Sequence, residues 1–155
     1  LTLRDEYTDL LQDEISRTVS SNSYLIDEFL VKLDSEQSLD LQFSDLSKNI
    51  LFHGHCHQKA ITGTTASLKT LRFPPNYTVE EIDSGCCGMA GSFGFEKEHY
   101  QMSMDIGRTK LLPAIQSKDN GWEIASMGAS CRQQIEHGSN RTSRHVIEIL
   151  RDAIT

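Results

Sequence analysis

The stretch NILFHGHCHQKA, residues 49–60, indicates the fold class of this chain. Its first five residues form a short apolar run, which is typical of a buried strand, and Gly54 marks the turn that ends it. A helical pattern of apolar residues follows and extends to Leu71. A buried strand that leads through a short turn into a helix is the repeating unit of α/β folds.

The same succession of strand and helix recurs twice further along the chain. Residues 77–82 and residues 122–126 are predicted to be strands. Helical spacing predicts a long helix that begins near Tyr100 and ends near Gly121, and a last helix over 146–153. Strands separated by helices of this length form right-handed βαβ units. We therefore predict an α/β fold with a small parallel sheet flanked by helices.

The residues before this pattern are predicted to form extra N-terminal helices. Apolar residues recur at helical spacing in the first segment at Leu3, Tyr7, Leu10 and Leu11. A second short helix is predicted over 23–33, and the polar residues 34–47 are predicted to be a surface connection. We expect a single domain over 1–155, with an N-terminal helical part at 1–47 and a core at 48–155.

Composition and charge exclude several functional classes. The chain has 155 residues, of which 37% are hydrophobic and 24% charged, as in an ordinary soluble protein. A net charge of −7 argues against nucleic-acid binding and against a polybasic membrane contact. No apolar run is long enough to span a membrane and no secretion signal is visible, so we expect a cytoplasmic protein. Because the chain begins at Leu1, we expect a fragment of a larger protein.

All four cysteines follow the carboxyl end of a predicted strand, at the turn into a helix. One follows the first strand, two adjacent ones follow the second, and one follows the third: Cys56, Cys86, Cys87 and Cys131. Because α/β sheets bind ligands at this edge, we expect the four thiols to meet there. Glycines beside them, including Gly85 and Gly88, leave space for an inorganic group and for hydrogen bonds from the backbone.

The chemistry and the spacing of the four cysteines limit the kinds of metal or cluster that they can bind. Soft thiolate ligands select zinc or iron–sulfur clusters. Zinc sites commonly use cysteines two to four residues apart, whereas here 30 positions separate Cys56 from Cys86 and 44 separate Cys87 from Cys131. Adjacent cysteines chelate one small ion poorly but can reach different irons of a cluster. The spacing favours an iron–sulfur cluster and leaves zinc open.

Three segments together resemble the CCG, or cysteine-rich, domain family: HGHCHQKA, GCCGMAGSFGFEKEHYQMSMDIGRTKLLPAI and GASCRQQI. The family includes heterodisulfide reductase B-type subunits and iron–sulfur components of glycolate and lactate oxidases. The likeness is closest to the C-terminal module of bacterial FAD-linked oxidase fusion proteins. The resemblance implies a [4Fe–4S] cluster on the four cysteines, and we expect it to be lost from isolated, air-purified protein. Members of the heterodisulfide type have a fifth cysteine where this chain has Gln134.

The resemblance also implies partners and a role. The family carries two CCG-bearing halves, so we expect the other half upstream, with flavin and ferredoxin-like domains that bind FAD. A 2-hydroxy acid would reduce the flavin, and this module would relay electrons to a quinone or another acceptor. The module is not expected to catalyse a reaction alone. Its partners would place it at the inner face of a membrane.

Two alternatives stay open at this point. One is a zinc-binding structural or docking module that uses the same four cysteines. The other is a metal-free redox domain in which Cys86 and Cys87 form disulfides with Cys56 or Cys131.

Three histidines, His53, His55 and His57, surround Cys56. Imidazole can replace thiolate on one iron of a cluster, or bind zinc. Because four cysteines already supply a full set of cluster ligands, the sequence favours a hydrogen bond to a sulfur, or a proton relay, by His55 or His57.

Overall fold

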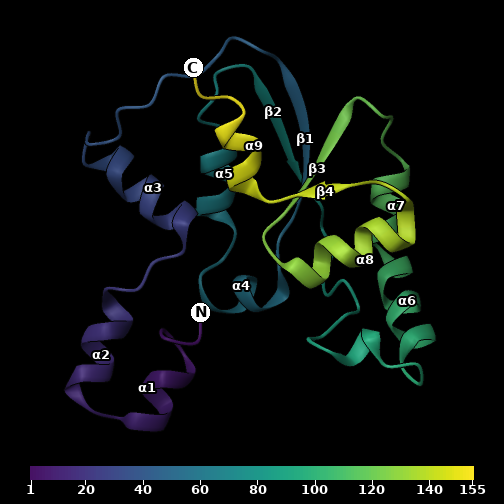
Figure 1. Ribbon diagram of the computed structural model, residues 1–155, viewed down its shortest axis with the longest axis horizontal. Helices are drawn as coiled ribbons and strands as arrows, with labels where there is room; N and C mark the ends of the chain where they lie inside the picture. The colour runs from purple at the N-terminus through teal and green to yellow at the C-terminus, as the bar shows by residue number, and fades with distance from the viewer.

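The computed structural model describes residues 1–155 and has an α/β architecture (Figure 1). Four parallel strands form one sheet in the order β2-β1-β3-β4. The strands are β1 (Lys48–His53), β2 (Tyr77–Glu81), β3 (Trp122–Ser126) and β4 (Ser143–Arg144). The predicted fold class and the three predicted strands are confirmed, whereas the sequence did not predict the short β4.

Nine α-helices and one 3₁₀ helix accompany the sheet. Before β1 lie α1 (Glu6–Leu11), α2 (Glu14–Ser21) and α3 (Ile26–Ser35). Between β1 and β3 lie α4 (Cys56–Ile61), α5 (Thr65–Leu71), the 3₁₀ helix η1 (Phe93–Phe95), α6 (Tyr100–Thr109) and α7 (Leu111–Gln116). After β3 lie α8 (Ala129–Ser139) and α9 (Val146–Arg151). No helix has both the length and the apolar character to cross a membrane.

Several helices are shorter than the sequence predicted. The expected long helix after Tyr100 is divided into α6 and α7 at Lys110, which has non-helical dihedral angles. Pro113 explains the break, because its ring clashes with the carbonyl four residues earlier in a continuous helix. The helix expected after β1 is likewise interrupted, at Gly63, whose φ is +74°. The unpredicted α2 is capped by the preceding Asp13, whose carboxylate accepts a hydrogen bond of 2.6 Å from the backbone N–H of Ser16.

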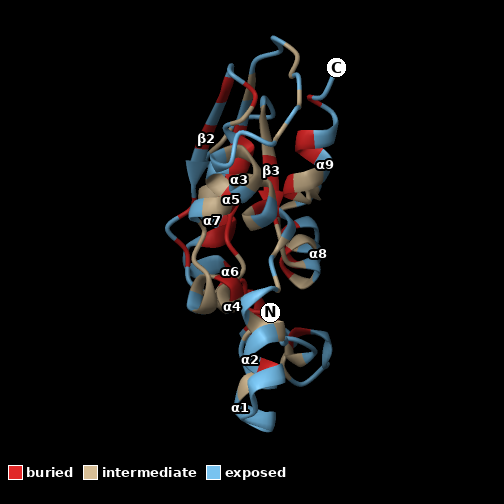
Figure 2. Ribbon diagram, turned by 90° about the vertical axis from the view of Figure 1, so that its left-hand side faces the viewer, coloured by how far each residue is buried: buried red, intermediate tan, exposed pale blue.

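The central strand β1 divides the core between the two faces of the sheet. Successive residues of a strand point to opposite faces. Ile50 and Phe52 pack with residues of α5 and α9, whereas Leu51 packs with residues of α7 and α8. Buried residues accordingly follow the sheet and the helices beside it, while α1 and α2 are almost entirely exposed (Figure 2).

Parallel pairing brings the carboxyl ends of three strands to one edge of the sheet. Near the end of β1, Phe52 is opposite Glu81 of β2 and Ala125 of β3, and His53 is opposite Ser126. The segments that follow these strands therefore start side by side, at the edge where ligands bind to parallel sheets.

Replacing Phe52 by alanine should lower the free energy of unfolding by about 3–5 kcal/mol, because this ring is fully buried in the central strand. Phe95→Ala is the matched control, since Phe95 is 62% exposed, and its effect should stay within about 0.5 kcal/mol. Urea denaturation, monitored by circular dichroism, measures both changes in the free energy of unfolding. Equal effects of the two substitutions would contradict the central position of Phe52.

Candidate metal centre

The structure brings all four cysteines to the carboxyl edge of the sheet. Cys56 is the first residue of α4, and Cys131 lies in the first turn of α8. Cys86 and Cys87 lie between β2 and η1, in residues 82–92, here named the CCG loop. The adjacent pair is therefore not at the start of a helix, contrary to the prediction. All four are free thiols; Cys87 and Cys131 are buried, and the other two are partly exposed.

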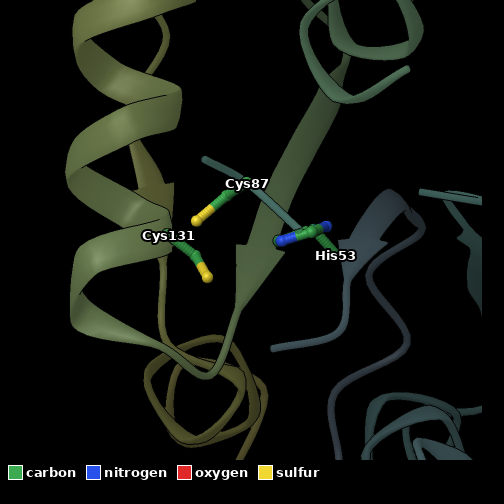
Figure 3. Close-up of side chains that lie close together, drawn as sticks. All are labelled: His53, Cys87 and Cys131. Atoms are coloured by element: carbon green, nitrogen blue, oxygen red, sulfur yellow. The ribbon is translucent and has the colours of Figure 1, made fainter. Parts of the chain in front are cut away.

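Cys87, Cys131 and His53 form the buried part of this site. The two Sγ atoms and a ring nitrogen of His53 lie within 4.8 Å of one another. Figure 3 shows both sulfurs and the imidazole directed toward a common space. His53 ends β1 two residues after Leu51, so its side chain points to the same face of the sheet. That face also carries the core cluster that contains Cys87 and Cys131.

One ring nitrogen of His53 forms a hydrogen bond, and the other forms none. A hydrogen bond of 2.8 Å joins Nδ1 to Oγ of Ser84 in the CCG loop. Nε2 is buried and makes no hydrogen bond. An unpaired buried polar atom costs about 1–3 kcal/mol and is uncommon in native proteins. The thiols and this free nitrogen are the donors that zinc and iron accept, so the residues fit a thiolate-bound metal group.

Cys56 and Cys86 form the more exposed part of the site. Burial and the adjacent Cys86 thiol raise the pKa of Cys56, which outweighs the lowering expected at a helix start. The backbone N–H of Gly88 donates a hydrogen bond of 3.3 Å to Sγ of Cys86. Helix α4 is fixed from its other side, where buried Gln58 donates a hydrogen bond of 2.8 Å to Oγ of Ser67. Cys56 is thus held on a helix anchored in the protein interior.

The buried cysteines Cys87 and Cys131 ionise unequally. The neighbouring Cys131 thiol lowers the pKa of Cys87 to about 4, against the effect of burial. The Cys87 thiolate, with burial, raises the pKa of Cys131 well above its ordinary value. Because the thiolate is the form that binds metal, Cys87 is ready to bind at neutral pH. Cys131 must release its proton when the metal binds.

The three histidines around Cys56 have different surroundings. His55 is half-buried, and its Nδ1 lies 3.4 Å from Sγ of Cys131, in the position predicted for a hydrogen bond to a sulfur. His57 instead lies near α1, with Nε2 3.8 Å from a carboxylate oxygen of Glu6. His53, which the sequence did not favour, is the fully buried one. Strand alternation from Leu51 would have placed it on the face of the buried thiols.

Gln134 anchors the CCG loop from α8. Its buried Nε2 donates hydrogen bonds of 3.0 Å to the carbonyl oxygens of Cys87 and Ser103, and lies 3.1 Å from Oγ of Ser103. Gln134 therefore holds the backbone of Cys87 in place. Gly88, next in the loop, has a φ of +102°, and a Cβ there would collide with the carbonyl oxygen of Ser103. Gly85 has no neighbour within 4 Å of a Cβ.

Comparison with known proteins relates the chain to parts of larger dehydrogenases. It is 30% identical over 154 residues to a subunit of the anaerobic glycerol-3-phosphate dehydrogenase of Escherichia coli (strain K12), covering 98% of this chain and 37% of that protein. It is 28% identical over 156 residues to D-2-hydroxyglutarate dehydrogenase of the same strain, covering 99% of this chain and 14% of that protein. The chain thus spans well under half the length of either relative. No protein-family model and no solved structure matches the chain.

Gly88→Ala should lower the free energy of unfolding by roughly 2–4 kcal/mol, because it adds a left-handed backbone strain and a collision with Ser103. Gly85→Ala is the matched control in the same loop, and we expect a change within about 1 kcal/mol. Thermal and urea unfolding of the metal-free proteins measure both. A Gly88→Ala protein as stable as the Gly85→Ala protein would refute the described loop conformation.

Proposed function

We propose that this chain is an electron-transfer module of a larger flavin-linked dehydrogenase, and that its four cysteines hold an iron–sulfur cluster. The observation that carries the proposal is the convergence of four free thiols beside an unpartnered, buried imidazole nitrogen. Dehydrogenase relatives that align with nearly the whole chain support a redox role. The resemblance to the CCG domain family supports a [4Fe–4S] cluster on Cys56, Cys86, Cys87 and Cys131.

The residues of the chain supply what such a cluster needs from a protein. A bound cluster supplies one-electron transfer, and four thiolates form a complete ligand set. The Gly88 N–H bonded to Cys86, and His55 beside Cys131, can lower the charge density on the sulfurs. Hydrogen bonds of this kind, together with solvent exposure, set the reduction potential. The inner side of the site, around buried Cys87, is closed to water. The outer side, around the partly exposed Cys56, is open to a redox partner.

The activity of the parent protein is the wider part of this proposal. We place FAD on a separate domain, accompanied by a ferredoxin-like segment and the other CCG half. The substrate class that we propose is a 2-hydroxy acid of the glycolate or lactate type. The names of the D-2-hydroxyglutarate dehydrogenase relatives support the 2-hydroxy-acid class. The acceptor that we propose is a quinone or another carrier, reached by a cytoplasmic protein that its partners hold at the inner face of a membrane.

Anaerobic incubation with iron and sulfide should load about four irons per chain and give an EPR signal on reduction. Cys87→Ser should lower the iron content by about tenfold or more, because it removes the buried cysteine whose pKa of about 4 makes it a thiolate at neutral pH. Met102→Ser is the matched control: it removes an exposed sulfur outside the site and should leave iron uptake unchanged. Iron and sulfide analysis with low-temperature EPR measures the effects.

Two results would overturn this proposal. Tight binding of one zinc without iron uptake would instead indicate a structural or docking module. A reversible two-electron dithiol–disulfide couple in protein that takes up no iron would indicate a thiol redox domain.

A further inference from the structure

We infer that His53 is a direct ligand, through Nε2, of the metal that Cys87 and Cys131 bind, so that the centre combines sulfur and nitrogen ligands. The inference rests on the proposed function and revises the ligand set given there: His53, and not cysteine alone, binds the metal at the buried side of the site. It differs from the sequence-based expectation, which favoured the four cysteines as the metal ligands and a hydrogen bond to a sulfur, or a proton relay, by His55 or His57.

The spacing of the three donor atoms suits a single metal ion. Zinc lies about 2.3 Å from a thiolate sulfur and about 2.0–2.1 Å from an imidazole nitrogen, so two ligands of one ion lie at most about 4.6 Å apart. The donor atoms of His53, Cys87 and Cys131 are all within 4.8 Å of one another. At most a small side-chain rotation is needed to bring them onto one ion.

The contacts of His53 leave Nε2 free for a metal. Nδ1 is occupied by the hydrogen bond to Oγ of Ser84. Metal-binding histidines commonly use their second nitrogen in this way, because the hydrogen bond fixes the tautomer and the orientation of the ring. Ser84 is itself fixed, since Nζ of Lys59 donates a hydrogen bond of 2.6 Å to its carbonyl oxygen. Figure 3 shows one ring nitrogen of His53 directed toward the two sulfurs, and Nε2 is the ring nitrogen that makes no hydrogen bond.

No other histidine near the cysteines meets the same conditions. His53 is 0% exposed, and its Nε2 is the one buried histidine nitrogen without a hydrogen-bond partner. His55 is only half-buried, and His57 lies beside Glu6. A metal ligand for Nε2 also removes the cost of leaving a buried polar atom unpaired.

The test uses protein labelled with [¹⁵N]histidine, loaded anaerobically with iron and sulfide, reduced, and measured by pulsed EPR. A ligand nitrogen couples much more strongly to the electron spin than a hydrogen-bonded one does. We expect the strong histidine coupling in the unchanged protein and in His99→Ala, whose ring is partly exposed and stacked on Phe93. His53→Cys, which replaces nitrogen by sulfur, should retain iron and lose the coupling.

A second measurement loads the protein with zinc alone and records X-ray absorption at the zinc edge. Imidazole scattering should be present in the unchanged protein and absent in His53→Cys. Ser84→Ala should retain that scattering and bind zinc about 10–100-fold more weakly, because only the orienting hydrogen bond is lost.

The outcomes separate this inference from the proposed function. Iron bound without strong histidine coupling, or a coupling that survives in His53→Cys, overturns the inference and leaves the function standing. Zinc held by His53 in a protein that takes up no iron supports the inference and overturns the function. A protein that binds neither metal overturns both.

Discussion

Parallel pairing of β1 with both β2 and β3 is the constraint on which the rest of the structure depends. It places the carboxyl ends of β1, β2 and β3 at one edge of the sheet, where Phe52 lies opposite Glu81 of β2 and Ala125 of β3. Three segments far apart in the sequence then start together, and each carries cysteine. A parallel sheet also needs crossover connections over its faces, so helices cover both sides and the inner thiols are buried. The site is a consequence of the topology.

The inner part of the site belongs to the hydrophobic core. Cys87 and Cys131 pack in the same cluster as Leu51 of β1, Ile124 of β3 and residues of α7 and α8. Side chains fixed by core packing hold donor atoms in place before a ligand arrives. Gln134 also fixes the backbone of the CCG loop, because its Nε2 donates a hydrogen bond to the carbonyl oxygen of Cys87. We therefore expect metal binding at the proposed site to be coupled to folding of the CCG loop, as in other proteins whose metal ligands come from separate segments.

Local patterns in the sequence predict the strands and the placement of the cysteines, but not the contacts between them. The apolar runs at β1, β2 and β3 depend on residues close in sequence, and so does the position of each cysteine after its strand. The division of α6 from α7 also has a local cause, Pro113, although the helical spacing of the apolar residues by itself predicted one continuous helix. The CCG loop takes its shape from Gln134 and Ser103, which are 31 residues apart, and no local pattern predicts that pairing. The orientation of His53 follows from strand alternation only once the buried face of Leu51 is known.

A redox-active iron centre on the converging cysteines is the central proposal for this protein. ⁵⁷Fe Mössbauer spectroscopy of intact cells that are grown on ⁵⁷Fe and produce the chain tests it most directly, because the protein is neither purified in air nor reconstituted with iron and sulfide. We expect an additional component of sulfur-coordinated iron that is absent from the spectrum of cells without the chain and that changes when the cells are reduced. Spectra that are identical with and without the chain would contradict the iron centre.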